Sequence, residues 1–365
     1  MRGSMEICSG RTYEGAHSKP DPGSYEWWYF DGWEEDTQTG FVLIFYEGNP
    51  FSSRYLNAVR RGEQRRAQEF PAVSLSVYHR GKPVYYVFEE VHLDDALIQA
   101  PERMSMAGCQ WTFSEENGEW VYLLKMDHQM PSGDTLTGSI KMQSPPFDKH
   151  LEGDLRGVSI DATPSGNHRW NPVQPDSRVS GHLSITGYRP HEMDLSGRGY
   201  HDHNVGSEPM SESFERWYWG RFHLPEQTFI YYLMKENGVW ERRAWLLSVD
   251  RITELSSGLW VLEDKERNCF GLDSPRRLRY EDEKFSLQID QADRLDNGPF
   301  YQRYASRLLF RDGEAIFQSE GISEVIRPNR IDWRWVRPLV DMRIRYPDRP
   351  PHWVQRSSRL YRWTW

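Results

Sequence analysis

The sequence predicts an all-β protein built from two consecutive antiparallel β-barrels, and three observations lead to that prediction. Short runs of alternating or β-branched residues recur along the chain, separated by turn signals such as Asn237-Gly238 and Asp312-Gly313. Segments with helical periodicity are scarce. A chain of 365 residues is also long enough for two cores of ordinary size. Many short strands with regular turns are typical of sandwiches and barrels, and closure removes exposed sheet edges.

The first half contains the strongest strand signal. Residues 25–32 form a strand pattern, and residues 41–46 are their expected hairpin partner. Further strands are expected at 73–78, 84–88, 110–113, 120–126, 136–142 and 182–186. Residues 57–70 are the best candidate for a short surface helix. Residues 144–175 are rich in Pro, Gly and Asp, so we expect a loop there, with His168 inside it.

An aromatic motif indicates where a second domain begins. Residues 214–219 (Phe-Glu-Arg-Trp-Tyr-Trp) repeat the pattern of residues 25–30 (Tyr-Glu-Trp-Trp-Tyr-Phe). We interpret the echo as a tandem duplication of one β-unit, with domains at 1–190 and 191–365. The second half then continues with expected strands at 228–234, 244–250, 259–262, 285–289, 305–310 and 315–318. The glutamates of the two motifs, Glu26 and Glu215, are expected to be structural partners of arginines.

Composition excludes several classes of function. A net charge of -9 gives no reason to expect a nucleic-acid partner. The three scattered cysteines, Cys8, Cys109 and Cys269, are interpreted as free thiols in a reducing compartment, which predicts a cytoplasmic location. The longest wholly apolar run, residues 41–46, is too short to cross a bilayer. Aromatic residues reach 14%, which favours β-structure and cavities with flat apolar walls.

The C-terminal segment, residues 327–365, differs from the rest in charge. It holds ten Arg, three Asp and no Lys or Glu, so 10 - 3 gives +7, and it carries five Trp. One interpretation is a patch that contacts anionic lipid at a membrane surface. The other is a final strand, in which Ile331, Trp333 and Trp335 alternate with polar residues, followed by a tail that packs on the barrels. Both interpretations stay open.

The main candidate site is residues 197–206, Gly-Arg-Gly-Tyr-His-Asp-His-Asn-Val-Gly. If this stretch is a strand, successive side chains point to opposite faces. Tyr200, Asp202 and Asn204 would then share one face, and His201, His203 and Val205 the other. Either triplet would form a polar site if its face looked into a cavity. We expect Tyr200 and Asp202 to face the cavity and the two histidines to turn outward.

Two motifs together resemble the carotenoid 1,2-hydratase (hydroxyneurosporene synthase) family, within a wider lipocalin-like group that includes the AttH proteins. They are Tyr-Glu-Trp-Trp-Tyr-Phe at 25–30 and Tyr-His-Asp-His-Asn at 200–204. The resemblance implies two tandem lipocalin-like barrels with a ligand cavity at or near their junction. It also implies that a His-x-Trp pair, here His168 and Trp170, joins Tyr200 and Asp202 in activity. The chain departs from the family pattern at Val205, where an aromatic residue is expected, and in its Arg/Trp-rich C-terminus.

The residue types suit the hydration of an isolated alkene. Protonating carbon requires a strong acid, and burial of Asp202 among aromatics would raise its pKa and keep it protonated near neutrality. Tyr200 would position the proton or the water, and His168 would accept a proton from the attacking water. Aromatic faces would stabilise the tertiary cation by about 1–2 kcal/mol per contact. The substrate-binding candidates are Trp170, Asn204, Trp217 and Trp219. This chemistry needs no metal or organic cofactor.

Other functions remain in competition with a hydratase. A cyclase or pericyclase would use the same kind of cavity to fold a polyene, with weak dependence on Asp202. A lipocalin-type carrier would bind an apolar ligand and leave it unchanged. A zinc site at His201 and His203 is a third possibility, although no Cys or carboxylate stands at ligand spacing beside them. The expected partner in every case except zinc binding is a hydrophobic small molecule.

Overall fold

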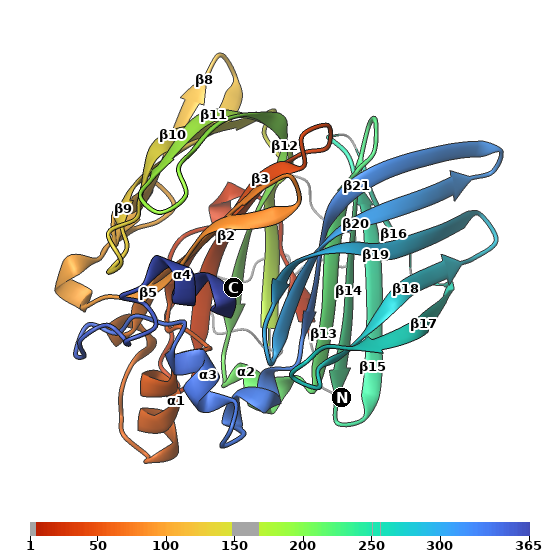
Figure 1. Ribbon diagram of the computed structural model, residues 1–365. Helices are drawn as coiled ribbons and strands as arrows, with labels where there is room; N and C mark the ends of the chain where they lie inside the picture. Colours follow the sequence, from red (N-terminus) through yellow and green to blue (C-terminus); the bar gives the residue numbers. More distant parts are fainter. Residues whose placement is uncertain (1–4, 148–167, 250, 256) are drawn as a thin grey trace. The chain divides into compact units, whose positions relative to one another are not determined.

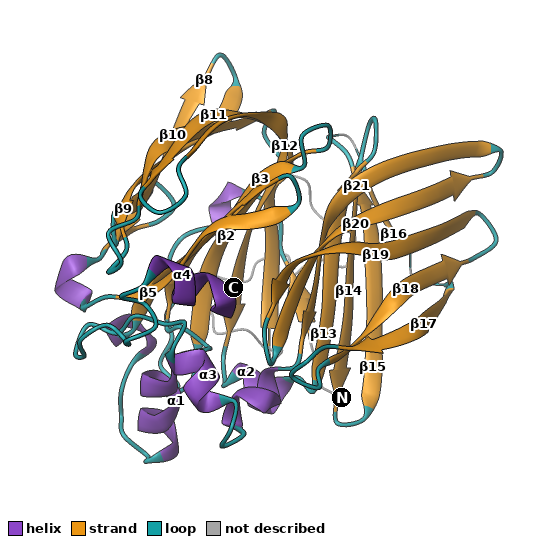
Figure 2. Cartoon of the chain, in the orientation of Figure 1, coloured by secondary structure: helices purple, strands orange, loops and turns teal. Residues whose placement is uncertain are grey.

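The computed structural model describes residues 5–147, 168–249, 251–255 and 257–365. Of these described residues, 58% lie in strands and 11% in helices, and Figures 1 and 2 show that the strands form two curled antiparallel sheets. The predicted all-β class is therefore confirmed. Two compact units contain these sheets: one comprises Met1–Ser213 with Arg337–Trp365, and the other comprises Phe214–Val336.

The first sheet belongs to the first unit and has twelve strands. Its path is β5-β4-β3-β2-β12-β11-β10-β9-β8-β7-β6, and β1 pairs in parallel with β11. The bounds are β1 Met5–Ile7, β2 Tyr25–Glu34, β3 Thr39–Glu47, β4 Pro71–His79, β5 Lys82–Glu90, β6 Leu97–Gln99, β7 Arg103–Met106, β8 Cys109–Glu116, β9 Glu119–Gln129, β10 Thr135–Ser144, β11 His168–Thr186 and β12 His191–Gly206.

The second sheet has nine strands in the order β16-β15-β14-β13-β21-β20-β19-β18-β17. The bounds are β13 Arg216–His223, β14 Thr228–Glu236, β15 Val239–Leu247, β16 Ile252–Glu254, β17 Leu259–Arg267, β18 Asp273–Glu281, β19 Phe285–Asn297, β20 Tyr301–Asp312 and β21 Ala315–Ile326. Its interior is an aromatic core in which residues such as Tyr218, Phe222 and Trp260 pack across the curled sheet.

The two sheets share one topology. In each, the first long strand pairs with the strand that follows it and with the last strand of the sheet. Thus β2 lies between β3 and β12, and β13 lies between β14 and β21. This arrangement brings β12, far along the chain, beside β2 and creates the setting of the candidate site.

The aromatic echo between β2 and β13 does not extend to side-chain direction. In the first unit Phe30 points into the interior, where its ring lies 5.9 Å from Trp111 and 5.6 Å from Tyr122. In the second unit the core residue is Tyr218, whose aligned partner is Tyr29, on the opposite face from Phe30. Because side chains alternate along a strand, a one-residue offset reverses the buried face. The echo therefore reflects similar composition without equivalent orientation.

The expected domain boundary at 190/191 falls between β11 and β12. These strands are hydrogen-bonded neighbours in one sheet, and their register continues through Ile185 and His191. The compact units instead divide after Ser213, and the last 29 residues, Arg337–Trp365, return to the first unit. Strand pairing keeps β12 with the first unit because its main-chain groups are satisfied by β11 and β2.

Two local predictions were wrong. Residues 168–175 were expected to be a loop but belong to β11. The register shifts between Pro172 and Gln174 and again between Gln174 and Ser177, and the second shift spans Pro175. The final strand expected at 331–335 is absent from that described segment, which forms a 3-10 helix over Pro328–Asp332. Pro328 suits the start of this helix, because its fixed φ is close to the helical value and its missing N–H is not needed in the first turn. Residues 148–167 of the predicted loop lie outside the described residues.

Helices are few and short. The predicted surface helix at 57–70 appears as α1, Ser53–Arg60, capped by Ser52, followed by the 3-10 turn η2, Ala67–Glu69. The remaining helices are α2 Met210–Ser213, α3 Arg337–Asp341 and α4 Ser358–Tyr361, with 3-10 turns η1 Arg11–Tyr13, η3 Leu93–Asp95, η4 Pro328–Asp332 and η5 Arg362–Thr364. Among the described residues, none of these helices has the length and apolarity to cross a bilayer.

Candidate functional site

The candidate site is organised by β12, which lies between β11 and β2. Residues 200–206 have cross-strand partners on β2, and most also have partners on β11. This double pairing fixes the predicted alternation, so Tyr200, Asp202 and Asn204 share one face while His201 and His203 point to the other. All five side chains are buried. The face that carries Asp202 also receives His168 and Trp170 from β11, and we call it the acid face.

Asp202 is held by three hydrogen-bond donors. The Tyr200 hydroxyl donates to Asp202 Oδ2 at 2.6 Å, and Trp170 Nε1 donates to the same oxygen at 2.9 Å. The Asn204 amide donates to Oδ1 at 2.7 Å. The carboxyl group is therefore fixed in position by two neighbours on its own strand and one on β11. Trp170 Nε1 also donates a hydrogen bond to the Tyr200 hydroxyl oxygen, at 2.9 Å.

The pKa of Asp202 is raised to about 7. Burial is the main cause, because the charged carboxylate loses its hydration, and the negative charge of Asp31 adds to the effect. The hydrogen bonds from Tyr200, Trp170 and Asn204 act in the opposite direction without cancelling it. A carboxyl group in this state is still partly protonated at neutral pH and can deliver a proton.

His168 is buried on β11 and is linked to Asp202 through Asn204, which hydrogen-bonds both residues. Its Nε2 lies 3.0 Å from Asn204 Oδ1, so Nε2 carries the proton, since the amide oxygen can only accept. Its Nδ1 lies 3.3 Å from the Tyr25 hydroxyl, which can donate to it. Burial lowers the pKa of His168 to about 3. His168 is therefore a neutral imidazole that orients Asn204, and the expected position in a loop was wrong.

Gly206 makes room for the Tyr25 ring. Gly206 pairs with Tyr25 on one side and with His168 on the other. A Cβ atom at position 206 would lie 2.1 Å from Cζ of Tyr25, which real contacts do not allow. The glycine at the end of the motif is needed so that the tyrosine can reach His168.

The opposite face of β12 points into the interior of the first unit. The His201 ring stacks on Phe30 at 3.9 Å and meets Tyr122 edge-on at 4.7 Å. Its Nε2 lies 3.0 Å from Glu14 Oε1, and its Nδ1 lies 2.9 Å from the carbonyl oxygen of Tyr29. The expectation that His201 and His203 turn outward was wrong, because both faces of this strand are covered.

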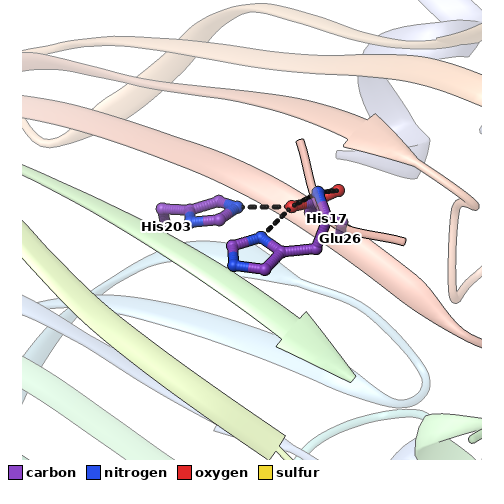
Figure 3. Close-up of side chains that lie close together, drawn as sticks. All are labelled: His17, Glu26 and His203. Atoms are coloured by element: carbon purple, nitrogen blue, oxygen red, sulfur yellow. Dashed lines mark hydrogen bonds and ion pairs between the residues drawn. The ribbon is translucent and has the colours of Figure 1, made fainter. Parts of the chain in front are cut away.

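His203 is joined to a buried charge cluster around Glu26, and Figure 3 shows His203 and His17 beside this carboxylate. His203 Nε2 lies 2.7 Å and His17 Nδ1 lies 2.9 Å from Glu26 Oε1. The Lys19 ammonium group bonds the other carboxylate oxygen and lies 2.7 Å from Glu47. Although burial opposes ionisation, Lys19 and the histidines hold the pKa of Glu26 well below its usual range. The predicted arginine partner of Glu26 is replaced by lysine and histidine.

The same cluster is the natural place to look for a metal. The ligand atoms of His17, Glu26 and His203 lie within 4.8 Å of one another. Both imidazoles, however, point at a single carboxylate oxygen, and Lys19 already supplies a positive charge to the other. The zinc alternative at His201 and His203 fits no better, since the two rings bond different carboxylates, Glu14 and Glu26. We therefore assign this face a structural role.

The predicted site residues fall into two groups. His168, Trp170, Tyr200, Asp202 and Asn204 come together on the acid face through the contacts above. Trp217 and Trp219 belong to β13 of the second unit, on the face opposite its core, where both pack near Tyr232. Their role in binding substrate stays a prediction.

Sequence reasoning missed four residues of β2 that share the acid face: Tyr25, Trp27, Tyr29 and Asp31. The signal was present, because they alternate within residues 25–32. It could not be read without the register that sets Tyr29 opposite Asp202 and Asp31 opposite Tyr200. Neighbouring strands extend this face with further aromatic rings: Trp27 lies 6.5 Å from Tyr46, which stacks on Phe88 at 5.6 Å.

We expect Gly206→Ala to disturb the acid face from a distance. The added methyl group must displace the Tyr25 ring, at a cost of roughly 1–3 kcal/mol, and remove its contact with His168. Thermal unfolding should show the loss of stability. Tyr25→Phe, which removes only the hydroxyl group, is the matched control and should change stability less. Equal stability of Gly206→Ala and the native chain would contradict the close approach.

Glu26→Gln should destabilise the first unit strongly. The change leaves the buried Lys19 ammonium group with Glu47 as its carboxylate partner, and breaking a buried ion pair typically costs about 3–5 kcal/mol. The control is Glu215→Gln at the aligned position of the second unit, where the carboxylate is 41% exposed and pairs with Lys235. Denaturant titration should show a large shift for the first variant and little for the second. Similar small shifts would show that the cluster adds nothing to stability.

Comparison with known proteins places the chain in a family. The family model for the carotenoid hydratase CrtC matches residues 43–355. A protein of Chlorobaculum tepidum named hydroxyneurosporene dehydrogenase is 32% identical over 89% of this chain and 88% of its own length. The acyclic carotenoid 1,2-hydratase of Thiocapsa roseopersicina is 28% identical, and the match covers 58% of this chain and 47% of that relative.

Solved structures show the same fold. A putative AttH protein from Nitrosomonas europaea superposes with a TM-score of 0.58 at 15% identity, covering 86% of this chain and 94% of the other. CghA in complex with Sch210972 superposes with a TM-score of 0.55 at 10% identity, covering 90% and 97%. The lipocalin-like AttH architecture expected from the motifs is therefore confirmed. With the family model matching most of its length, this chain belongs to the carotenoid hydratase family and is an enzyme, a hydratase of polyene substrates.

Proposed function

We propose that this enzyme adds water to an isoprenoid C=C bond of a carotenoid-like substrate by acid catalysis, with Asp202 as the proton donor. The observation that carries the proposal is the state of Asp202: fully buried, fixed by three donors and with its pKa raised to about 7. General acids work best when their pKa lies near the working pH. Family membership supplies the reaction class, and this carboxyl group supplies the proton.

The residues around Asp202 have separate roles in the proposed mechanism. Trp170 and Asn204, expected to bind substrate, both donate to the carboxyl group and so aim it. His168 was expected to accept a proton from water. A pKa of about 3 makes it a poor base, and both ring nitrogens are engaged. We therefore assign His168 the role of positioning Asn204.

The aromatic rings on the acid face suit a polyene. Trp27, Tyr46 and Phe88 form a continuous row across β2, β3 and β5. Flat apolar faces match a conjugated chain, and their quadrupoles attract a developing tertiary carbocation by about 1–2 kcal/mol per desolvated contact. The substrate would lie along this row with its reacting double bond at Asp202.

Asp202→Asn should abolish turnover while the protein stays folded. Loss of the acid should lower kcat by about 10²–10⁴-fold, the usual contribution of general acid catalysis. Asp176→Asn is the matched control, because that carboxylate lies on neighbouring β11 but is 41% exposed and paired with Arg198. Turnover of an acyclic carotene is measured for both. Near-native activity in Asp202→Asn would refute the acid assignment.

Activity should fall as pH rises through about 7. The raised pKa of Asp202 means that the protonated, active form is present below that value and is lost above it. A rate that stays constant from pH 6 to pH 9, roughly one unit below to two above that pKa, would contradict the assignment.

Heavy water separates the competing activities. A hydratase must place deuterium on carbon in a product that has gained one water, whereas a pericyclic closure leaves the mass unchanged. A carrier returns the ligand unaltered. A dehydrogenation, the activity in the name of one relative, would remove two hydrogens. Mass spectrometry of the product distinguishes all four outcomes.

A peripheral membrane contact through the C-terminal segment is part of the proposal, because carotenoid-like substrates dissolve in lipid. Residues of this segment join β5 and the β11–β12 turn around a surface pocket of about 450 Å³. Its lining comprises Lys82, Pro83, Tyr188, Arg189, Arg359, Arg362, Trp363 and Trp365, and no Asp or Glu side chain. Tyr188 is 52% and Trp363 is 78% exposed. Cations beside exposed aromatics suit an anionic bilayer surface.

Vesicle binding should depend on this pocket. We expect the native chain to sediment with phosphatidylglycerol vesicles and not with phosphatidylcholine vesicles, and the double variant Arg359→Glu/Trp363→Ser to lose binding. Arg61→Glu, an equal charge change at a side chain that is 62% exposed on the same unit, should bind normally. Binding that survives the double variant, or that Arg61→Glu abolishes equally, would refute the surface.

A further inference from the structure

The acid face carries a second buried carboxyl group, Asp31, on β2. Its exposure is 0%, and the Tyr29 hydroxyl donates to its Oδ2 at 2.9 Å. On β12 the Tyr200 hydroxyl donates to Asp202 Oδ2 at 2.6 Å in the same way. Each strand therefore holds a tyrosine that donates to an aspartate two residues later.

The antiparallel register places these two pairs head to tail. Tyr200 lies opposite Asp31, and Asp202 lies opposite Tyr29. The two tyrosine rings meet at 6.1 Å, with a 60° angle between their planes. The aspartates are diagonal neighbours on one face, a relation that corresponds to about 7 Å between Cβ atoms. Two carboxyl groups that share a dry site resist ionising together, so one tends to keep its proton while the other is charged.

We propose that Asp31 is the general base of the hydration, working opposite the acid Asp202. The inference rests on the proposed function. In the first step the alkene π electrons take the proton of the Asp202 carboxyl group, which forms a C–H bond, a tertiary cation and the Asp202 carboxylate. In the second step a water oxygen bonds to the cation, and the Asp31 carboxylate takes the proton that this water releases. Return of that proton from Asp31 to Asp202 completes the cycle, so the net change is alkene plus water to alcohol.

The strand register places groups around Asp31 that suit the role of base on this face. Tyr29 on its own strand donates to it, and Tyr200 and Asp202 lie beside it on β12. Arg198 follows on the same face, one pair further along β12, and is bonded to Asp176. The other strand beside Asp31, β3, presents Val42 opposite it. His168, the alternative base, has both ring nitrogens in hydrogen bonds, and its pKa is lowered to about 3 by burial.

Asp31→Asn in heavy water separates a base from a structural residue. Without the base, Asp202 should still deuterate the alkene, and the Asp202 carboxylate can take a proton back from the cation. We expect recovered alkene that contains deuterium, with alcohol formation reduced at least 100-fold. Asp202→Asn should give neither exchange nor alcohol. Native alcohol formation by Asp31→Asn, or loss of exchange together with alcohol in a folded Asp31→Asn, would overturn the proposal.

A second pair of variants keeps both carboxyl groups and tests the same idea if Asp31→Asn does not fold. Removing a donor raises the pKa of the carboxylate that accepted its bond. Tyr29→Phe should therefore move the acid limb of the pH–rate profile to higher pH, and Tyr200→Phe should move the alkaline limb. An acid limb that Tyr29→Phe leaves in place would overturn the role of Asp31. Absence of any hydration by the native chain would instead refute the proposed function.

Discussion

The double pairing of β12 with β11 and β2 is the constraint on which the site depends. It fixes the direction of every side chain from Tyr200 to Val205, and the side chains on both faces of the strand are buried. One face can then hold a carboxyl group in a dry environment. On the other face, His201 and His203 point into the interior and contact Glu14 and Glu26 there. A slip of one residue would exchange the two faces, placing Asp202 among the interior aromatics and the histidines on the acid face.

The two faces differ in the partners that surround their buried carboxyl groups. In the interior, Glu26 is ion-paired with Lys19 and hydrogen-bonded to His203, and Glu14 is ion-paired with Arg11 and lies 3.0 Å from His201. On the acid face, Asp202 receives neutral donors only, and the nearby Asp31 is also acidic. This difference is why the pKa of Glu26 falls while the pKa of Asp202 rises. The interior cluster stabilises the strand that presents the acid.

Much of the fold could be read from the sequence. The sequence identified β2, β3, β4 and most strands of the second unit. Apolar residues alternate in β4, and β3 is a continuous apolar run that follows the aromatic motif of β2. Asn-Gly and Asp-Gly mark the turns between β14 and β15 and between β20 and β21. The pattern failed at residues 168–175, where Pro and Asn suggested a loop. Those residues nevertheless extend β11, because β12 on one side, with β1 alongside residues 168–170, supplies hydrogen-bond partners that local sequence does not reveal.

The sequence by itself determined the strand character of residues 200–206 and the separation of Asp202 from the neighbouring histidines, because alternation follows from local geometry alone. It also carried the resemblance that the family comparison confirmed. Only the tertiary structure decided which groups meet Asp202. Trp170 and Asp31 lie 32 and 171 positions from Asp202 in the chain, as 202 - 170 and 202 - 31 show, and strand register brings them together. The state of each titratable group follows from that assembly, since burial and neighbouring charge set its pKa.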